Sequence, residues 1–166
     1  MYKIDIPTSE QDFNDYFAFR WKMLREPWKH PKGSEKDEYE QVSQHRMIRD
    51  THGNVIAVGR MHMNSAEEAQ VRHVAVEKQY QTKGLARMLV SALESVARSE
   101  GAERIVTNST QLAIGFFKSM GFELQSETSI DLGDQHRSQM IKRLIDPNTI
   151  VLHPDWCKLL QDTWHD

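Results

Sequence analysis

Apolar residues recur at the spacing of an α-helix in two segments, residues 9–25 and 84–99. Ser9 is placed to cap the first helix, with Glu10 and Asp12 near the positive end of its dipole. The first apolar stripe consists of Phe13, Phe17, Arg20 or Trp21, and Leu24. The second consists of Leu85, Met88, Leu89, Ala92, Leu93 and Val96, with Gly101 as a stop signal. Both patterns predict amphipathic helices.

Short β-branched or alternating runs, separated by turn residues, predict the strands. The polar turn at residues 50–54 joins Met47–Ile48 to Val55–Gly59 as a hairpin. A second turn at Asn64–Glu68 leads into Val71–Val76, which makes three adjacent antiparallel strands. The other predicted elements are strands Tyr2–Ile6, Arg104–Thr107, Phe122–Leu124 and Gln139–Leu144, with a helix over Thr110–Met120.

This order of elements predicts the fold class. Strands and helices follow one another as β-α-β-β-β-α-β-α-β-β, which indicates an α/β fold with a mixed, mostly antiparallel sheet flanked by helices. Pro27, Pro31 and Gly33 interrupt the pattern, so residues 28–39 are predicted to form a loop, with room for a short helix from Glu35 onward. A turn is predicted at residues 131–134.

Composition excludes several classes of protein. The 166 residues suit one domain, and the net charge of −3 argues against a dedicated nucleic-acid binder, which needs a concentrated basic face. No apolar run is long enough to cross a bilayer, and Cys157 has no partner for an intrachain disulfide. We therefore expect a protein with no membrane association in a reducing, cytoplasmic setting.

The segment with the clearest chemistry is the loop between the strand ending near Glu77 and the helix opening at Gly84. A helix start presents unpaired backbone N–H groups and a positive dipole end, and Gly84 lets an anion approach them closely. Ala86 keeps that approach open, and the preceding donors are Gln81, Thr82 and Lys83. The loop lacks the nucleoside-triphosphate and dinucleotide glycine patterns. From the residues of this loop alone, two interpretations stay open: the loop binds a diphosphate, or it only connects the strand to the helix.

Two motifs in this order resemble the GNAT N-acetyltransferase superfamily. The run Gln81–Ala86, with residues Gln81, Thr82, Lys83, Gly84, Leu85 and Ala86, is similar to the family's Q/R-x-x-G-x-G/A loop. The run Ala113–Phe122 is similar to its A-x-x-F-Y-x-x-x-G-F segment. The resemblance covers about Tyr2 to Leu144 and implies binding of acetyl-CoA without a metal.

Parts of the chain also resemble the N-terminal GNAT domain of bacterial proteins that join it to a thioesterase-like domain. These parts are Phe19–Arg25, Pro31–Glu35 and Asp155–Cys157. The resemblance implies a GNAT domain over residues 1–146 and a C-terminal extension over residues 147–166. Whether the chain is free-standing or part of a longer product stays open, as does its oligomeric state.

The resemblance also implies roles for cofactor-binding residues. The backbone of Val74, Ala75 and Val76 is expected to bind the pantetheine arm and to offer N–H groups to the oxyanion. Asn108 and Ser109 could bond the same arm or simply cap a helix. Phe117 stands where the family often has a tyrosine acid, so it could pack against pantetheine or in the core, and solvent, Tyr80 or Ser119 would have to protonate the thiolate.

Several residues are candidates for the general base. His73 lies on the strand that should pass the thioester, and histidine has a pKa suited to proton transfer near neutral pH. His62 and a water chain to a carboxylate are alternatives, whereas Arg72 suits an ion pair or an acidic ligand. Trp28, His30 and Tyr39 could line the acceptor pocket or merely fasten their loop.

Two functions from different classes follow. The first is an N-acetyltransferase that moves an acetyl group directly from acetyl-CoA to a small-molecule or protein amine. The alternative is an acyl-CoA-binding or regulatory module with little turnover, associated with a thioesterase-like partner domain. Phe117 favours the second, and the intact Gln81–Ala86 loop suits both. A structural domain without a ligand is the remaining possibility.

Overall fold

The computed structural model describes residues 1–132 and 135–144. In chain order, its main elements are β1 (Ile4–Asp5), α1 (Glu10–Leu24), β2 (Gln44–Arg49), β3 (Val55–Met63), β4 (Glu68–Val76), α2 (Leu85–Ser99), β5 (Arg104–Thr110), α3 (Ile114–Ser119), β6 (Glu123–Leu132) and β7 (Gln135–Arg143). Four short 3-10 turns complete them: η1 (Glu26–Trp28), η2 (Glu40–Val42), η3 (Lys78–Tyr80) and η4 (Gln111–Ala113). The order of strands and α-helices confirms the one predicted from sequence.

The strands form one seven-stranded sheet in the order β1-β2-β3-β4-β5-β7-β6. Every neighbouring pair is antiparallel except β4 and β5, which are parallel. A parallel pair needs a long crossover, and α2 provides it. The mixed, mostly antiparallel sheet of the predicted α/β fold is therefore confirmed.

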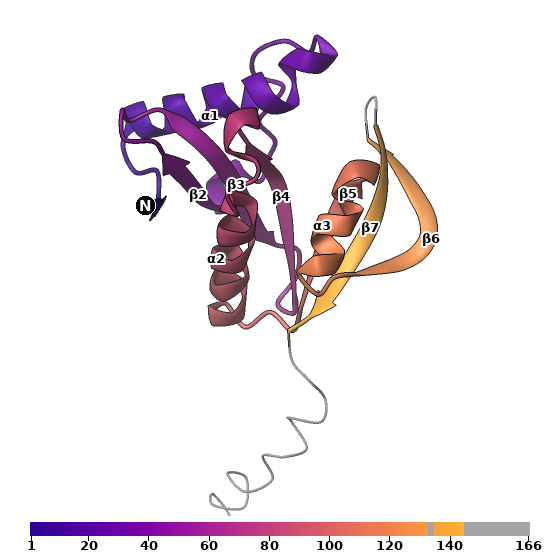
Figure 1. Ribbon diagram of the computed structural model, residues 1–166. Helices are drawn as coiled ribbons and strands as arrows, with labels where there is room; N and C mark the ends of the chain where they lie inside the picture. The colour runs from indigo at the N-terminus through magenta and orange to yellow at the C-terminus, as the bar shows by residue number, and fades with distance from the viewer. Residues whose placement is uncertain (133–134, 145–166) are drawn as a thin grey trace, which may run out of the picture.

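Helices cover both faces of the sheet (Figure 1). Tyr16 and Phe19 of α1 pack with Met47 and Val58 on one face. Ile48, next to Met47, packs with α2 on the opposite face, as alternation along a strand requires. α3 shares a core with α2 on that second face. The buried face of α2 overlaps the predicted apolar stripe, because Leu85, Leu89 and Leu93 are fully enclosed. The stripe is displaced on the helix, since Val90 and Ala97 are also buried while Met88, Ala92 and Val96 are only half-buried.

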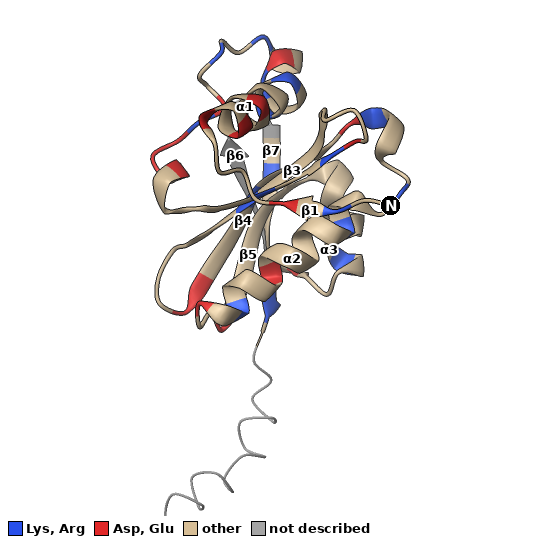
Figure 2. Ribbon diagram, turned by 90° about the vertical axis from the view of Figure 1, so that its left-hand side faces the viewer, with Lys and Arg blue, Asp and Glu red and all other residues tan. Residues whose placement is uncertain are grey.

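Charged residues lie mostly on helices, loops and strand ends, but basic segments also interrupt β4 and β7 (Figure 2). Of the helices in the described ranges, none is both long and apolar enough to span a bilayer.

β4 and β5 separate about halfway along their length (Figure 1). The parallel ladder pairs Glu68–Val71 with Arg104–Thr107 and then stops, although β4 runs on to Val76 and β5 to Thr110. β5 stays paired with β7 throughout, so its remaining free edge faces β4. On the other side of β4, His73 and Val74 together oppose Gly59 in a β-bulge.

Two sequence-based boundaries next to the cleft were wrong. β5 continues to Thr110, so Asn108 and Ser109 lie within a strand and are not helix caps. The following helix begins at Ile114, after a 3-10 turn, and not at Thr110. Pairing with β7 along its whole length holds the polar end of β5 in the strand. Part of the predicted 131–134 turn, the Asp155–Cys157 segment and the 147–166 extension lie outside the described residues.

Candidate active site

A cleft of about 470 Å³ opens where β4 and β5 separate. Its walls come from the end of α1, from β4 and β5, from α3 and from β7. The cleft brings together five of the catalytic or cofactor-binding residues predicted from sequence, namely His73, Val74, Asn108, Ser109 and Phe117. Trp28 and His30 line it as well, as expected for an acceptor pocket, whereas Tyr39 stacks on His62 and is not among the residues that line it. Residues separated by about half the chain therefore share one site.

The N-terminus of α2 is built to leave its first amides available. Gly84 is the N-cap residue, with a φ of 79° that favours glycine, and no side chain caps the helix. A Cβ at Gly84 would meet no heavy atom within 4 Å, so the space beside this backbone is open. Residues 81–84 are exposed. Together these features keep an approach to the helix start open.

At the start of α1, by contrast, capping side chains already occupy backbone amides of the first turn. There Ser9 Oγ accepts from the Asp12 amide at 3.0 Å, and the Asp12 carboxylate accepts from the Ser9 amide at 3.3 Å. The first turn of α2 contains no acidic residue. Among the described residues of α2, the first backbone amide that donates to a carbonyl is that of Met88. Its acceptor is the Gly84 oxygen. Donors that precede it are open to an external anion.

One member of the predicted cradle has a different task. Gln81 Nε2 donates to the backbone oxygen of Val76 at 3.0 Å, which fastens the loop to the end of β4. Thr82 and Lys83 stay exposed at the same point. The side chain of Gln81 therefore shapes the loop, and the backbone amides and Lys83 are the groups that face solvent.

His73 is held in a strained, enclosed position at the bulge. Its φ of 58° is one that non-glycine residues seldom adopt. The side chain is 5% exposed, and Nε2 lies 3.7 Å from Asp37 Oδ2, which is longer than a hydrogen bond. Burial lowers the pKa of His73 well below its usual value, and Asp37 opposes this without reversing it. The imidazole is therefore neutral at neutral pH.

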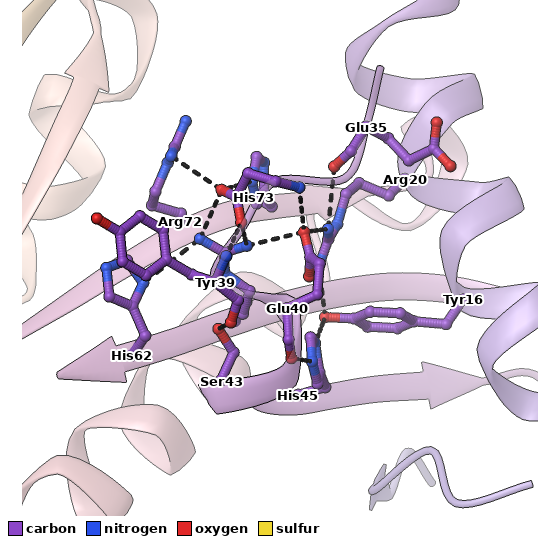
Figure 3. Close-up of polar contacts among 12 residues, drawn as sticks. Tyr16, Arg20, Glu35, Tyr39, Glu40, Ser43, His45, His62, Arg72 and His73 are labelled. Carbon is purple, nitrogen blue, oxygen red and sulfur yellow. Dashed lines mark hydrogen bonds and ion pairs between the residues drawn. The ribbon is translucent and has the colours of Figure 1, made fainter. Parts of the chain in front are cut away.

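Asp37 is hydrogen-bonded into a largely buried polar network, whose labelled members in Figure 3 include Arg20, Glu40 and Arg72. Arg60 donates to both Asp37 oxygens at 2.7 and 3.0 Å, and also to Glu40 at 2.9 Å. Arg20 donates to the same Glu40 oxygen at 2.7 Å. Burial works against ionisation of Asp37, but its contact with His73 and the hydrogen bonds from Arg60 outweigh burial and hold its pKa well below the usual range. The Asp37 carboxylate is therefore charged.

The network continues along α1 to a second buried histidine. The Tyr16 hydroxyl accepts from Arg20 Nη2 at 3.0 Å and lies 2.8 Å from His45 Nδ1 (Figure 3). Burial raises the pKa of Tyr16 to about 12, so the hydroxyl stays protonated. The helical stripe pattern already contained Arg20, but its complete burial could not be read from it. Its partners come from distant segments.

The same network tests whether a metal suits this site. Asp37, Glu40 and His73 offer ligand atoms that lie within 4.8 Å of one another. The guanidinium groups of Arg20 and Arg60 already form ion pairs with both carboxylates, so this set of oxygen atoms favours arginine over a metal ion. The expectation of a metal-free reaction stays a prediction.

Other candidates lie away from the cleft. Tyr80 packs edge-on against Tyr2, and Ser119 donates to the Phe116 carbonyl at the exposed end of α3. His62 is stacked on Tyr39. Phe117 is both a core residue and part of the cleft wall. Sequence reasoning missed Arg25 and Arg137, which also line the cleft, because no local pattern marks them.

The buried histidines predict how stability depends on pH. Burial is the main cause that lowers the pKa of His45, His62 and His73 in the folded protein. Below a pH of about 6.5 the unfolded chain then binds more protons than the folded protein, so the folded protein loses stability as the pH falls. We expect the free energy of unfolding, measured by urea denaturation, to fall steadily from pH 7.5 to 5.5.

A variant isolates the contribution of one histidine. His73→Gln should flatten this pH dependence, whereas His52→Gln, at an exposed turn position, should leave it unchanged. The carboxylates with lowered pKa, such as Asp12 at about 2, lose their stabilising effect only at more acidic pH. Equal slopes for wild type and His73→Gln would contradict the assignment to His73.

Comparison with known proteins identifies relatives of this chain in sequence and in fold. The chain is 27% identical over 139 residues to an uncharacterized N-acetyltransferase, YjcF, of Bacillus subtilis (strain 168), covering 83% of this chain and 98% of that protein. An acetyltransferase of the GNAT family from Staphylococcus aureus Mu50 superposes with a TM-score of 0.72 at 12% identity, covering 87% of this chain and all of that one (100%). A GNAT family acetyltransferase from Elizabethkingia anophelis, solved with acetyl-CoA bound, gives a TM-score of 0.63 at 12% identity, with 86% and 98% coverage.

The two structures establish likeness of fold only, because their identities are low. The sequence itself is more specific. The sequence model of the acetyltransferase (GNAT) family matches residues 13–122, a span that includes most of α1, the Gln81–Ala86 loop and Phe117. Because this match extends over more than half of the sequence, the chain belongs to the acetyltransferase (GNAT) family.

Proposed function

We propose that this protein transfers an acetyl group from acetyl-CoA to an amine, with the cofactor lying in the cleft between β4 and β5. The observation that carries the proposal is the interrupted ladder, which ends at Val71 and Thr107 while both strands continue. The free edge of β4 can then pair with the amides of a pantetheine arm as it would with another strand. The backbone of residues 74–76 is the part assigned to it.

The two ends of the cofactor have separate places in this proposal. The diphosphate lies at the open start of α2, bound by backbone amides of Gly84, Leu85 and Ala86, with Thr82 and Lys83 beside it. The thioester lies in the cleft, bordered by Asn108 of β5 and Phe117 of α3. The chemistry of both places fits acetyl-CoA, since anionic phosphates meet free N–H donors and the methylene groups next to the thioester meet an aromatic ring.

The transfer itself requires a neutral amine. An alkylammonium with a pKa of about 10 has no lone pair to attack with, so a base must first take its proton. The amine nitrogen then bonds to the thioester carbon, the C–S bond breaks, and the departing thiolate takes up a proton. Neutral His73 is assigned as the base, either directly or through a water molecule.

The bulge at His73 and Val74 supports stabilisation of the oxyanion. The extra residue of a β-bulge is not paired with the neighbouring strand, so a backbone amide there is available to the developing negative charge. For the leaving thiolate, no tyrosine is found among the described cleft-lining residues, and the Thr107 and Ser109 hydroxyls donate to backbone carbonyls. Solvent is therefore assigned as the proton source.

The second candidate function is an acyl-CoA-binding module with little turnover that serves a thioesterase-like partner. The favouring observation is Phe117, whose ring occupies the cleft wall without an acidic hydroxyl. Both functions predict tight binding of CoA, so only turnover distinguishes them. Small-molecule and protein amines are both possible acceptors under the first.

Amine-dependent release of thiol from acetyl-CoA tests the proposal. We expect release with a panel of amines, and we expect His73→Gln to reduce kcat/KM by about 100-fold at pH 7. The reduction should shrink towards pH 9.5, because a growing share of the amine is then already neutral. Affinity for CoA, measured by calorimetry, should not change.

Two other outcomes of these measurements would change the assignment. An equal loss of kcat/KM at pH 7 and 9.5 would remove His73 from the role of base. Tight CoA binding without any amine-dependent thiol release would favour the binding module.

A further inference from the structure

Arg72 and His73 are neighbours on β4, yet both side chains reach the same carboxylate (Figure 3). Arg72 Nη1 lies 3.1 Å and His73 Nε2 lies 3.7 Å from Asp37 Oδ2. Consecutive residues of a regular strand point to opposite faces of the sheet. The bulge opposite Gly59 and the φ of 58° at His73 break this alternation. The strained backbone of β4 thus brings the ring of His73 to Asp37.

Asp37 is fixed in place from several directions. Arg60 donates to Oδ1 and Oδ2 at 2.7 and 3.0 Å, and the Tyr39 amide donates to Oδ1 at 2.9 Å. Arg72 adds a fourth hydrogen bond, to Oδ2. A carboxylate accepts about four hydrogen bonds, so His73 stands at the distance of an ion pair and not of a hydrogen bond. Asp37 is therefore a fixed negative charge beside the ring.

The ring of His73 lies between this charge and the cleft. Its Nε2 is enclosed, faces Asp37 and has no hydrogen bond to any described residue. The side chain also lines the cleft to which the thioester is assigned. A lone pair on Nε2 would be repelled by the carboxylate, whereas an N–H group there would be attracted. Asp37 thus favours a neutral ring with its proton on Nε2 and its lone pair on Nδ1.

Several other charged or titratable groups lie near the ring. They are Arg20 of α1, Arg60 of β3, Arg72 of β4 and Glu40 of η2, with Arg25, His30 and Arg137 along the same cleft and Glu35, whose charge acts on Arg25. Burial is the main cause that lowers the pKa of His73, and the first three of these arginines lower it further. Asp37 makes the largest contribution in the opposite direction, so it favours the protonated ring.

We propose that Asp37 is a positioning residue that holds His73 in the Nε2–H form, so that Nδ1 takes the proton from the acceptor amine. This role rests on the acetyl transfer proposed above. The proton moves from the amine nitrogen to Nδ1, and the ring becomes an imidazolium with N–H on both nitrogens, which Asp37 stabilises. After the transfer, the ring gives one proton to solvent and is neutral again. Asp37 itself stays ionised, because its pKa is well below the usual range.

The position of the ring proton can be measured without turnover. Nitrogen NMR distinguishes a protonated ring nitrogen from an unprotonated one, and the signals of His73 are those missing from His73→Gln. At pH 7 we expect the wild type to carry the proton on Nε2 only, and Asp37→Asn to show a mixture of both forms. A wild-type ring with its proton on Nδ1 would overturn the proposal, even if Asp37→Asn does not fold.

Glu40→Gln is the matched control. It removes the same charge from the same network, and Arg60 donates to Glu40 at 2.9 Å as it does to Asp37. Glu40 makes no hydrogen bond or ion pair with His73 in the described part of the chain. This variant should therefore keep the Nε2–H form. A mixture of forms in Glu40→Gln as well would mean that the network as a whole, and not Asp37, orients the ring.

A double-mutant cycle tests whether Asp37 acts through His73. In the thiol-release assay at pH 7, Asp37→Asn should lower kcat by about 10- to 100-fold, with a smaller change in KM. In the His73→Gln background the same substitution should lower kcat no further, because the group on which it acts is gone. Glu40→Gln should have an effect of the same size in both backgrounds. An equal loss from Asp37→Asn with and without His73 would show that Asp37 has a structural role only.

The two measurements separate this proposal from the proposed transfer. A wild-type protein that shows the Nε2–H form but releases no thiol with any amine would support the pairing of Asp37 with His73 and contradict the acetyl transfer. An active protein whose His73 carries its proton on Nδ1 would support the transfer and contradict the positioning by Asp37.

Discussion

Replacing Arg60 by methionine should reduce the free energy of unfolding by about 3–5 kcal/mol, the usual cost of removing one partner from a buried ionic network. The Arg60 side chain is completely buried and binds both Asp37 and Glu40. Methionine fills similar volume but leaves two enclosed carboxylates with fewer donors. Because small proteins are stable by only about 5–15 kcal/mol, the variant should unfold at a much lower urea concentration. Urea denaturation followed by circular dichroism measures the change.

Arg49→Met provides the control for this variant. Arg49 also contacts two carboxylates, those of Asp12 and Asp15, but 21% of its side chain is exposed. Solvent screens such pairs, so its loss should cost less than about 1 kcal/mol. If the two variants lose similar stability, burial is not what makes the Arg60 network important. A soluble but unfolded Arg60→Met protein would agree with the prediction.

The Gly84→Asp substitution should weaken CoA binding by at least about 100-fold, equivalent to about 2.7 kcal/mol at this site. A side chain at Gly84 meets no protein atom within 4 Å, so it would extend into the space assigned to the diphosphate. It would also place a negative charge beside the phosphates. The fold should tolerate the change, because aspartate adopts a positive φ more readily than most residues. Calorimetric titration with CoA measures the loss.

Two further variants separate charge, volume and backbone strain. Gly84→Asn has nearly the same volume without the charge and should lose clearly less affinity than Gly84→Asp. Gly53→Asp introduces the same residue at a φ of 86° with equally open surroundings, but in the β2–β3 turn. It should bind CoA as the wild type does. Unchanged affinity in Gly84→Asp would mean that the start of α2 does not bind the diphosphate.

Local sequence determined helices α1 and α2, the β2–β3 hairpin and the glycine-capped start of α2. The stripes of α1 and α2 appear in the sequence because a helix buries every third or fourth residue. The cap at Ser9 and the glycines at 84 and 101 depend on backbone conformations that few residue types satisfy. These requirements act over a few neighbouring residues, so a sequence alone can show them.

In two strands, the tertiary structure overrides the pattern expected from the local sequence. Alternation along β4 breaks at His73 and Val74, because the bulge opposite Gly59 inserts one residue. The polar end of β5 remains a strand because β7 pairs with it as far as Thr110. Neither effect has a signal in the segment concerned, since each depends on a strand elsewhere in the chain.

The sequence by itself determined the family, the order of elements and the glycine-capped start of α2, since each is encoded by nearby residues. Only the tertiary structure decided which charges are buried together. Arg20 and Arg60 look like ordinary polar positions until packing removes them from water beside Asp37 and Glu40. Electrostatic partners are chosen through space, at distances set by the folded sheet, and a linear pattern contains no measure of those distances.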